Sequence, residues 1–199
     1  MVHIVDDDAA MRDALAWLFQ TRNVHAYQWD SGEAFLSAWE PAMPGCILLD
    51  IRMPGMSGLE VFDALLERHA SQAVVFLSGH GDLASAVEAL KRGAADFIEK
   101  PFNDNDVVDR VLAAGVAAAK KRQAAQLAEQ RETLLKTLSV RERDVLRCVL
   151  QGMLNKQIAD MLGVSMRMVE VHRARVLEKM GLRNVVELAR LFGHDFQNS

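Results

Sequence analysis

The chain has 199 residues, of which half are apolar and a quarter are charged. This length suits one large or two small globular domains, and the longest apolar runs are too short to span a membrane. The net charge of −4 hides an asymmetry, because residues 1–103 carry 7 Lys and Arg against 15 Asp and Glu, whereas residues 139–199 carry 10 Lys and Arg against 7 Asp and Glu. An acidic half joined to a basic half predicts two functions in one chain.

Apolar runs alternate with helical patterns through the first half of the chain. The runs predict strands at residues 2–5, 24–28, 46–49, 73–77 and 95–98. The helical patterns predict helices at residues 9–19, from Ser31, at 57–68, from an N-cap at Asp82 to Arg92 with Gly93 as its stop, and from Asp104. Strands that are apolar throughout are typical of a sheet covered on both faces. The alternation therefore predicts an α/β fold with a five-stranded, parallel, doubly wound sheet, whose ligand site lies at the carboxyl ends of the strands.

The second half of the chain is predicted to be helical. Residues 104–138 contain almost no Pro or Gly and read as one long helix leaving the first domain. Leu127, Leu134 and Leu138 form a short apolar stripe, but polar residues break the heptad pattern, which favours a semi-rigid helical spacer over a coiled coil. Ser139 and Glu142 have capping-box spacing, and further helices are predicted at residues 156–162, 166–180 and 185–191.

Acidic and polar residues end four of the predicted strands. They are Asp6, Asp7 and Asp8 after the first strand, Asp50 after the third, Ser78 after the fourth, and Lys100 after the fifth. A single Asp in such a place is commonly a helix cap or a solvated turn residue. Together, however, clustered carboxylates favour Mg²⁺, and a nearby Lys and hydroxyl are suited to phosphoryl oxygens.

Four motifs of the first 119 or so residues resemble the receiver domain of two-component response regulators. HIVDDD, LLDIRMPGMSG, FLSGHGD and DFIEKPF occur in the family's order, with 43 residues from Asp7 to Asp50 and 50 from Asp50 to Lys100. The resemblance implies that Asp50 is the phosphoacceptor and that Asp6 and Asp7 bind Mg²⁺ (or Mn²⁺) with the backbone carbonyl of Arg52. It further assigns a catalytic role to Lys100, both a catalytic and a switch role to Ser78, and a switch role to the aromatic Phe97. Asp8 lies outside the motif and is expected to cap a helix, and Lys100–Pro101 is expected to be cis.

The stretch NKQIADMLGVSMRMVEVHRARVLEKMG, residues 155–181, has helix-turn-helix spacing. Ala159 is small where two helices cross, Gly163 suits the turn, and Val169 is apolar where the second helix meets the first. Opposite the apolar face of the second helix lies a mixed face that suits a DNA major groove, although a solvated amphipathic face has the same periodicity. The candidate DNA contacts are Lys156, Arg167, Glu170, Val171, Arg173, Ala174, Arg175 and Lys179.

Residues 138–191 resemble the LuxR-type DNA-binding domain, and the order of the two regions resembles the FixJ/NarL family of transcription regulators. We therefore expect a receiver domain at 1–119, a helical linker at 120–137 that continues the fifth receiver helix, and an all-α, four-helix DNA-binding domain at 138–199. The resemblance implies a sensor histidine kinase, promoter DNA and RNA polymerase as partners. It also implies a homodimer, formed on phosphorylation through the fourth helix and fifth strand, that acts as an activator. Two departures are the modest charge of the basic half and Glu170, which stands where relatives often have Lys.

The chain is expected to be cytoplasmic and not to contact membranes. Cys46 and Cys148 lie far apart, which argues against a disulfide framework, and MVHIVDDD lacks the basic region of a secretory signal. No enzymatic activity is expected beyond the chain's own phosphoryl transfer and dephosphorylation. Three other functions compete with this interpretation. They are a Mg²⁺-dependent phosphohydrolase, for which Arg52 stands where a second carboxylate is needed, a phosphorylation-independent DNA binder, and a protein-only adaptor.

Overall fold

The computed structural model describes residues 1–79 and 83–192, with only the backbone for Leu83 and Ala84. The predicted N-cap Asp82 lies outside the described residues. Two compact units, Met1–Gln123 and Ala124–Ser199, divide the chain. Within the described ranges, no helix is both long and apolar enough to cross a membrane.

The first unit is built on a parallel sheet. Its strands are β1 (Val2–Val5), β2 (Ala26–Trp29), β3 (Cys46–Asp50), β4 (Ala73–Ser78) and β5 (Asp96–Glu99). They pair in the order β2-β1-β3-β4-β5, and every pairing is parallel. The helices are α1 (Ala9–Thr21), α2 (Gly32–Ala38), α3 (Gly58–Glu67), α4 (Leu83–Lys91) and α5 (Asp104–Lys136). The predicted doubly wound architecture is confirmed.

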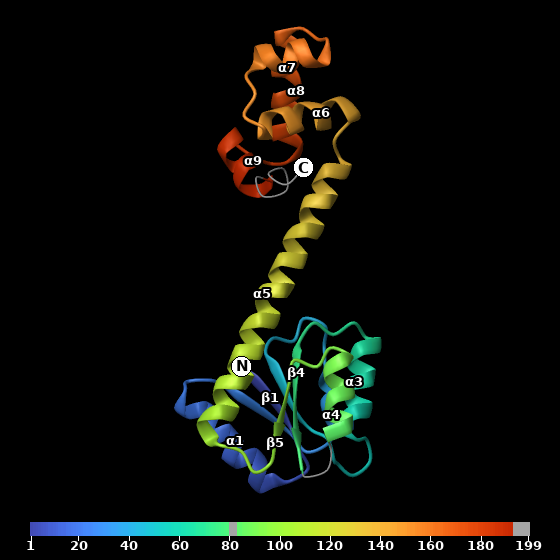
Figure 1. The fold of residues 1–199 in the computed structure, drawn as a ribbon, viewed down its shortest axis with the longest axis vertical. Helices are drawn as coiled ribbons and strands as arrows, with labels where there is room; N and C mark the ends of the chain where they lie inside the picture. The colour runs from blue at the N-terminus through green and yellow to red at the C-terminus, as the bar shows by residue number, and fades with distance from the viewer. Residues whose placement is uncertain (80–82, 193–199) are drawn as a thin grey trace. The chain divides into compact units, whose positions relative to one another are not determined.

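Helices cover both faces of the sheet (Figure 1). On one face, Leu15 and Phe19 of α1 and Val108 of α5 pack on the sheet. On the other, α2, α3 and α4 contribute a second core that includes Phe35 and Phe62. The central strands β1, β3 and β4 are buried along their whole length, which explains why they read as continuous apolar runs.

The second strand begins two residues later than its composition predicts. The apolar run predicts that Val24 opens the strand, but the amide of Val24 donates to the carbonyl of Phe19 at 3.0 Å. Asn23 adopts a left-handed conformation with φ 56°. Val24 therefore belongs to the turn that closes α1, and the strand starts at Ala26.

The second unit is helical. It contains the last part of α5, followed by α6 (Val140–Leu150), α7 (Asn155–Leu162), α8 (Met166–Lys179) and α9 (Val185–Phe192). Ser139 and Glu142 form the predicted capping box at the start of α6. Gly163 has φ 64° and ends α7, so it makes the turn between the two helices of the predicted helix-turn-helix, and Val169 is fully buried behind it.

The helix α5 is continuous, and its two ends belong to different cores. Val107 and Val111 near its start are buried in the first unit. Near its end, Leu135 packs on the core of the second unit, and the guanidinium of Arg131 lies 6.0 Å from the ring centroid of Phe192. The last turns of α5 are therefore part of the second unit's packing.

Candidate functional site

Three charged side chains meet at the carboxyl ends of the parallel strands. The register pairs Val5 with Leu49, which places the next residues, Asp6 and Asp50, side by side. The ammonium of Lys100, just after β5, lies 2.9 Å from Oδ2 of Asp6 and 2.5 Å from Oδ1 of Asp50. All three side chains are largely shielded, with exposures of 24% for Lys100, 2% for Asp6 and 8% for Asp50. The site is therefore one cation shared by two buried carboxylates.

Backbone groups hold the second oxygen of each carboxylate. The amide of Asp8 donates to Oδ1 of Asp6 at 2.9 Å, and the amide of Arg52 donates to Oδ2 of Asp50 at 2.8 Å. The guanidinium of Arg12 donates to the backbone carbonyls of Asp6 and Asp7 at 2.8 and 3.0 Å. The two hydrogen bonds from Arg12, a residue of α1, hold the acidic loop after β1 in place.

The surroundings shift the pKa of both partners of the ion pair upwards. Burial raises the pKa of Asp50, and the charge of Asp6 adds to this effect, against the lowering by the hydrogen bond from Lys100. For Lys100, burial alone would lower the pKa, but the hydrogen bonds to Asp50 and Asp6 outweigh it and raise the pKa above its ordinary value. Lys100 is thus held in its charged form.

The loop after Asp50 is pinned from two sides. Glu33 of α2 accepts a hydrogen bond from the amide of Met56 at 2.9 Å, and Glu60 of α3 accepts one from the amide of Ser57 at 2.8 Å. Gly58 opens α3 directly against the strand, since a Cβ there would lie 2.1 Å from the carbonyl oxygen of Asp50. The backbone on either side of the carboxylate is therefore rigidly placed.

Ser78 lies on β4, the strand next to β3, and Phe97 lies on β5, one strand further along the sheet. Ser78 ends β4, is 1% exposed, and its hydroxyl donates to the carbonyl of Gly79 at 2.9 Å. Phe97 on β5 is half-buried against the core that contains Phe62. The carbonyl of Phe97 accepts a hydrogen bond from Arg110 of α5 at 2.7 Å. The two residues predicted to act as a switch thus lie on adjacent strands.

In the second unit, α8 has one buried and one exposed face. Val169, Val176 and Met180 are buried, as the periodicity predicts. The opposite face is exposed and consists of Arg167, Glu170, Val171, Ala174, Arg175 and Glu178. A helix with an exposed mixed face, held by a preceding helix and a glycine turn, has the arrangement that reads a DNA major groove.

Two family models match the two units. Residues 2–112 match the response regulator receiver domain, and residues 136–192 match the bacterial regulatory proteins of the luxR family. The chain belongs to the response regulators. Its order of a receiver followed by a LuxR-type DNA-binding domain makes it a transcriptional regulator of a two-component system.

Relatives of this response regulator match it over nearly its whole length. The C4-dicarboxylate transport transcriptional regulatory protein DctR of Rhodobacter capsulatus is 48% identical, in an alignment that covers 96% of this chain and 98% of DctR. The transcriptional regulatory protein FixJ of Azorhizobium caulinodans is 46% identical, in an alignment that covers 96% of this chain and 90% of that FixJ.

Solved structures of response regulators match as well. The response regulator StyR superposes with a TM-score of 0.79 at 35% identity, covering 97% of this chain and 98% of StyR. Full-length FixJ from B. japonicum gives a TM-score of 0.63 at 35% identity, covering 100% of this chain and 98% of FixJ. The fold class predicted from the sequence is therefore confirmed.

The receiver of this response regulator brings most of the predicted site residues together. Lys100 contacts both Asp6 and Asp50, and the amide of Arg52 contacts Asp50, whereas Asp7 is exposed. Asp8 caps α1 by accepting from the amides of Ala10 and Met11, and the Lys100–Pro101 bond is cis, both as expected.

The donor chemistry of the cluster suits a hard divalent cation. Asp6 and Asp50 carry two negative charges against the one positive charge of Lys100, and the nearby donors are oxygens. Across residues 1–79 and 83–192, no three His, Cys, Asp or Glu side chains are already gathered around a common point. The residues therefore fit a metal by charge and donor type, without a preassembled cage.

Two of the candidate DNA contacts are engaged inside the DNA-binding domain. The ammonium of Lys179 lies 2.7 Å from Oε2 of the buried Glu142 and also donates to the carbonyl of Thr137. Arg173 is half-buried and donates to the side chain of Asn155. The other candidates, which are all exposed, are Lys156, Arg167, Glu170, Val171, Ala174 and Arg175.

Several residues that shape the two sites were missed by reasoning from the sequence. Arg12 and Glu33 hold the loops around Asp6 and Asp50, and Asn155 holds Arg173. Arg12 and Glu33 bind backbone groups of neighbouring loops, and Asn155 binds the side chain of Arg173 on another helix. Such contacts leave no motif, because they depend on where the helices start and how they pack.

Proposed function

We propose that this response regulator accepts a phosphoryl group on Asp50 from a sensor histidine kinase and then binds promoter DNA as a dimeric activator. The observation that carries the proposal is the pair of contacts from Lys100 to Asp50 and Asp6 at the carboxyl ends of the strands. A buried carboxylate beside a fixed cation is suited to receive a transferred phosphoryl group.

In the transfer, a carboxylate oxygen of Asp50 attacks the phosphorus of a phosphohistidine or of a small phosphodonor. With phosphohistidine, the new P–O bond forms as the P–N bond breaks, and the leaving imidazole nitrogen keeps the electron pair and takes a proton from solvent. With a small acyl phosphate, the donor's P–O bond breaks instead, and a carboxylate leaves with the electron pair. Lys100 retains its proton, because its pKa is raised, and neutralises charge on the phosphoryl oxygens. The chain's contribution is mainly positioning and charge neutralisation.

Mg²⁺ or Mn²⁺ would be held by Asp6, Asp7, Asp50 and the backbone carbonyl of Arg52. When bound, the metal supplies positive charge against the phosphoryl oxygens. The negative balance of the cluster in its absence supports this assignment. Arg12 fixes the carbonyls of Asp6 and Asp7 and so holds the acidic loop in place for the ion.

Phosphorylation acts on the rest of the molecule through Ser78 and Phe97. The Ser78 hydroxyl, now bonded to the carbonyl of Gly79, turns to a phosphoryl oxygen, and Phe97 moves into the space that this vacates. The two arrangements differ in their contacts with the phosphoryl group, which shifts the population between them.

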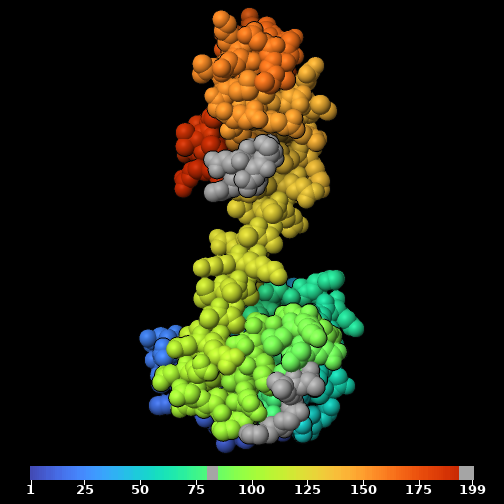
Figure 2. Space-filling model, viewed as in Figure 1, coloured from blue at the N-terminus to red at the C-terminus, as the bar shows by residue number. Residues whose placement is uncertain are grey.

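The surface of α4 and β5 is the proposed dimer interface. Val87 and Leu90 of α4 are 44% and 43% exposed and lie three residues apart on the helix, so they offer apolar area to a partner. Part of this surface, coloured green, is visible in Figure 2. A dimer would place two copies of α8 in successive major grooves about one helical turn apart, and the bound activator would contact RNA polymerase.

No separate substrate is proposed. The chain would catalyse only its own phosphorylation and dephosphorylation, since Arg52 occupies the place where a phosphohydrolase of this type needs a second carboxylate. Multiple turnover of a phosphate ester would contradict this proposal.

Intact-mass measurement of phosphoryl incorporation tests the site. With a small acyl phosphate and Mg²⁺, the wild-type chain should gain one phosphoryl group and Asp50→Asn none. Asp13→Asn, which changes an exposed acid of α1, is the matched control and should be labelled like the wild type. Labelling of Asp50→Asn would overturn the phosphoacceptor, and full labelling in EDTA would overturn the metal.

A further inference from the structure

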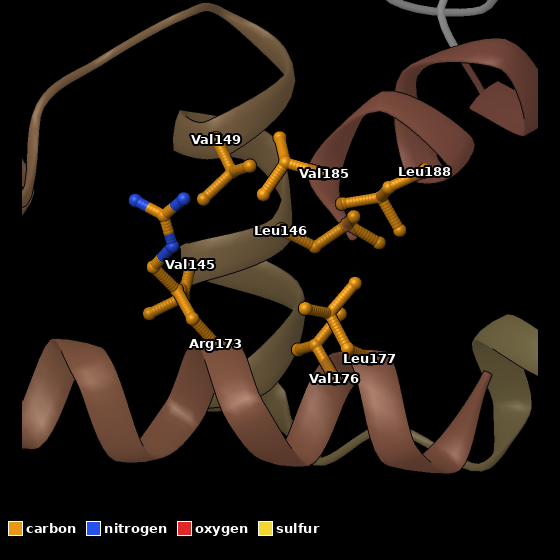
Figure 3. Close-up of a pocket in the computed structure, with 8 residues that line it drawn as sticks. All are labelled: Val145, Leu146, Val149, Arg173, Val176, Leu177, Val185 and Leu188. Atoms are coloured by element: carbon orange, nitrogen blue, oxygen red, sulfur yellow. The ribbon is translucent and has the colours of Figure 1, made fainter. Parts of the chain in front are cut away.

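Arg173 lies on the proposed DNA-reading helix but points into the domain. Figure 3 shows its side chain extending from α8 towards Val145 and Val149 of α6. It lines an apolar pocket at the meeting of α6, α8 and α9, together with Val176 and Leu188. The aliphatic stem of the arginine therefore packs against apolar side chains, and its head leaves the pocket at one side.

The guanidinium of Arg173 is held by a residue of another helix. Its Nη1 donates to Oδ1 of Asn155 at 2.5 Å, and both residues are half-buried. Asn155 is the first residue of α7, and the next residue, Lys156, is exposed. The contact thus ties the middle of α8 to the start of the helix that carries the predicted phosphate contact.

The neighbouring arginine of α8 is arranged differently. Arg175, two residues along, is exposed on the face with Arg167 and Glu170. An arginine that reads a base presents its planar fork to the groove. The head of Arg173 is committed to a neutral amide of its own domain, so the two arginines differ in direction and in surroundings.

We propose that Arg173 is a positioning residue for DNA binding, not a DNA contact. By holding Asn155, it fixes the start of α7, and with it Lys156 and the first amides of that helix, relative to the exposed face of α8. Phosphate contacts of this kind set the register of a reading helix on the duplex. The proposal rests on the proposed DNA-binding function.

The role predicts an energetic link between Arg173 and Asn155. If Arg173 acts through Asn155, removing either partner should produce the same defect, and removing both should add little, because residues of one contact are not additive. If Arg173 instead touches DNA, Asn155→Ala should be harmless or should release the arginine for the duplex. Asn155 is neutral, so its loss removes no charge from the interface.

The test uses the full-length protein treated with beryllofluoride, with Arg173→Met, Asn155→Ala, the double variant and Arg175→Met as control. Methionine keeps the apolar stem in the pocket, which favours retention of the fold. Circular dichroism melts verify that every variant is folded at the assay temperature. Affinity for a long mixed-sequence duplex is measured against salt concentration, and base preference is measured by selection from a randomised duplex pool.

We expect Arg173→Met and Asn155→Ala each to weaken binding about tenfold, which corresponds to the loss of one hydrogen bond to a charged group. The double variant should bind no more weakly than either single variant, and the selected base preference should match the wild type. Arg175→Met should lower the salt slope by about 0.9 if it meets a phosphate, and its effect should add to that of Asn155→Ala.

Three results would overturn the role of Arg173 alone. In the first, Asn155→Ala binds DNA as tightly as the wild type while Arg173→Met binds more weakly. In the second, Arg173→Met changes the base preference at one position, and in the third it binds DNA as tightly as the wild type although its melting temperature is lower. A wild-type chain that fails to bind DNA at all would overturn the proposed function and this role with it. The two failures are therefore distinguishable.

Discussion

Lys100 and Asp50 form an ion pair across the carboxyl end of the strand that lies between them. Nζ of Lys100 is 2.5 Å from Oδ1 of Asp50, and β4, which ends in Ser78, separates β3 from β5 in the sheet. The charge pair and the switch hydroxyl therefore occupy three neighbouring strand ends. The proposed phosphoacceptor, its counter-ion and the proposed switch residue are therefore neighbours at one edge of the sheet.

The two partners of this pair should have opposite effects on stability. Lys100→Met leaves the buried carboxylates of Asp6 and Asp50 without their cation, and we expect it to lower the free energy of unfolding by about 3 kcal/mol. Asp50→Asn removes a carboxylate whose raised pKa shows that its charged form is disfavoured, so it should be at least as stable as wild type. Urea unfolding measures both, and destabilisation by Asp50→Asn equal to that by Lys100→Met would contradict the charge imbalance.

Magnesium should stabilise the first unit through the acidic cluster. At a concentration ten times its dissociation constant, Mg²⁺ should add about 1.4 kcal/mol to the free energy of unfolding. Asp6→Asn should lose this gain, because it removes a carboxylate that faces Asp50 across Lys100. Thermal melts with and without EDTA measure the effect. Equal stabilisation of wild type and Asp6→Asn would place the ion elsewhere.

Ser78→Ala should separate phosphorylation from its consequence. The hydroxyl donates to the carbonyl of Gly79 in this structure, and a phosphoryl oxygen offers it a stronger acceptor. Without it, we expect labelling of Asp50 to persist but the gain in DNA affinity on phosphorylation to fall about tenfold, with Ser78→Thr as the conservative control. An undiminished gain in Ser78→Ala would remove Ser78 from the switch.

The second unit contains a pair that makes its stability depend on pH. The hydrogen bonds from Lys179 and Ser139 lower the pKa of Glu142 to about 2 from its ordinary value of 4.5. Because the pKa is lower in the folded state, the pair stabilises the domain above pH 4.5 and loses this effect as the pH falls from 4.5 towards 2.

Glu142→Gln should therefore lower the free energy of unfolding of the second unit by about 1 to 2 kcal/mol near neutral pH and by little at low pH. The expected loss is this small because the Lys179 side chain is 40% exposed and solvent screens the ion pair. Hydrogen exchange of the α6 amides measures the difference. The matched control is Glu178→Gln, which changes an exposed acid of α8. A cost that persists at low pH would contradict the ion pair.

The strand ends of the receiver could be read from the sequence because parallel topology brings them to one edge. Asp6 and Asp50 each follow an apolar run directly, and Lys100 follows the fifth strand, so their meeting required only the strand order. The turn at Gly163 and the buried Val169 followed from local chemistry in the same way.

The inward direction of Arg173 could not be read in this way. On a helical wheel it lies near the boundary between the buried and exposed faces, and a long flexible side chain can follow either. Its direction is decided by Asn155 and by the pocket that α6 and α9 form with α8. Lys179 is similar, because its partner Glu142 lies 37 residues away on another helix.

Control of DNA binding by Asp50 is tested most directly by measuring DNA affinity and sedimentation of the same samples with and without beryllofluoride. The probe is a genomic fragment enriched by the treated wild-type chain. We expect wild type to shift from monomer to dimer and to bind at least about tenfold more tightly, a bias of about 1.4 kcal/mol, while Asp50→Asn changes in neither respect. Binding by Asp50→Asn as tight as that of treated wild type would contradict phosphorylation control.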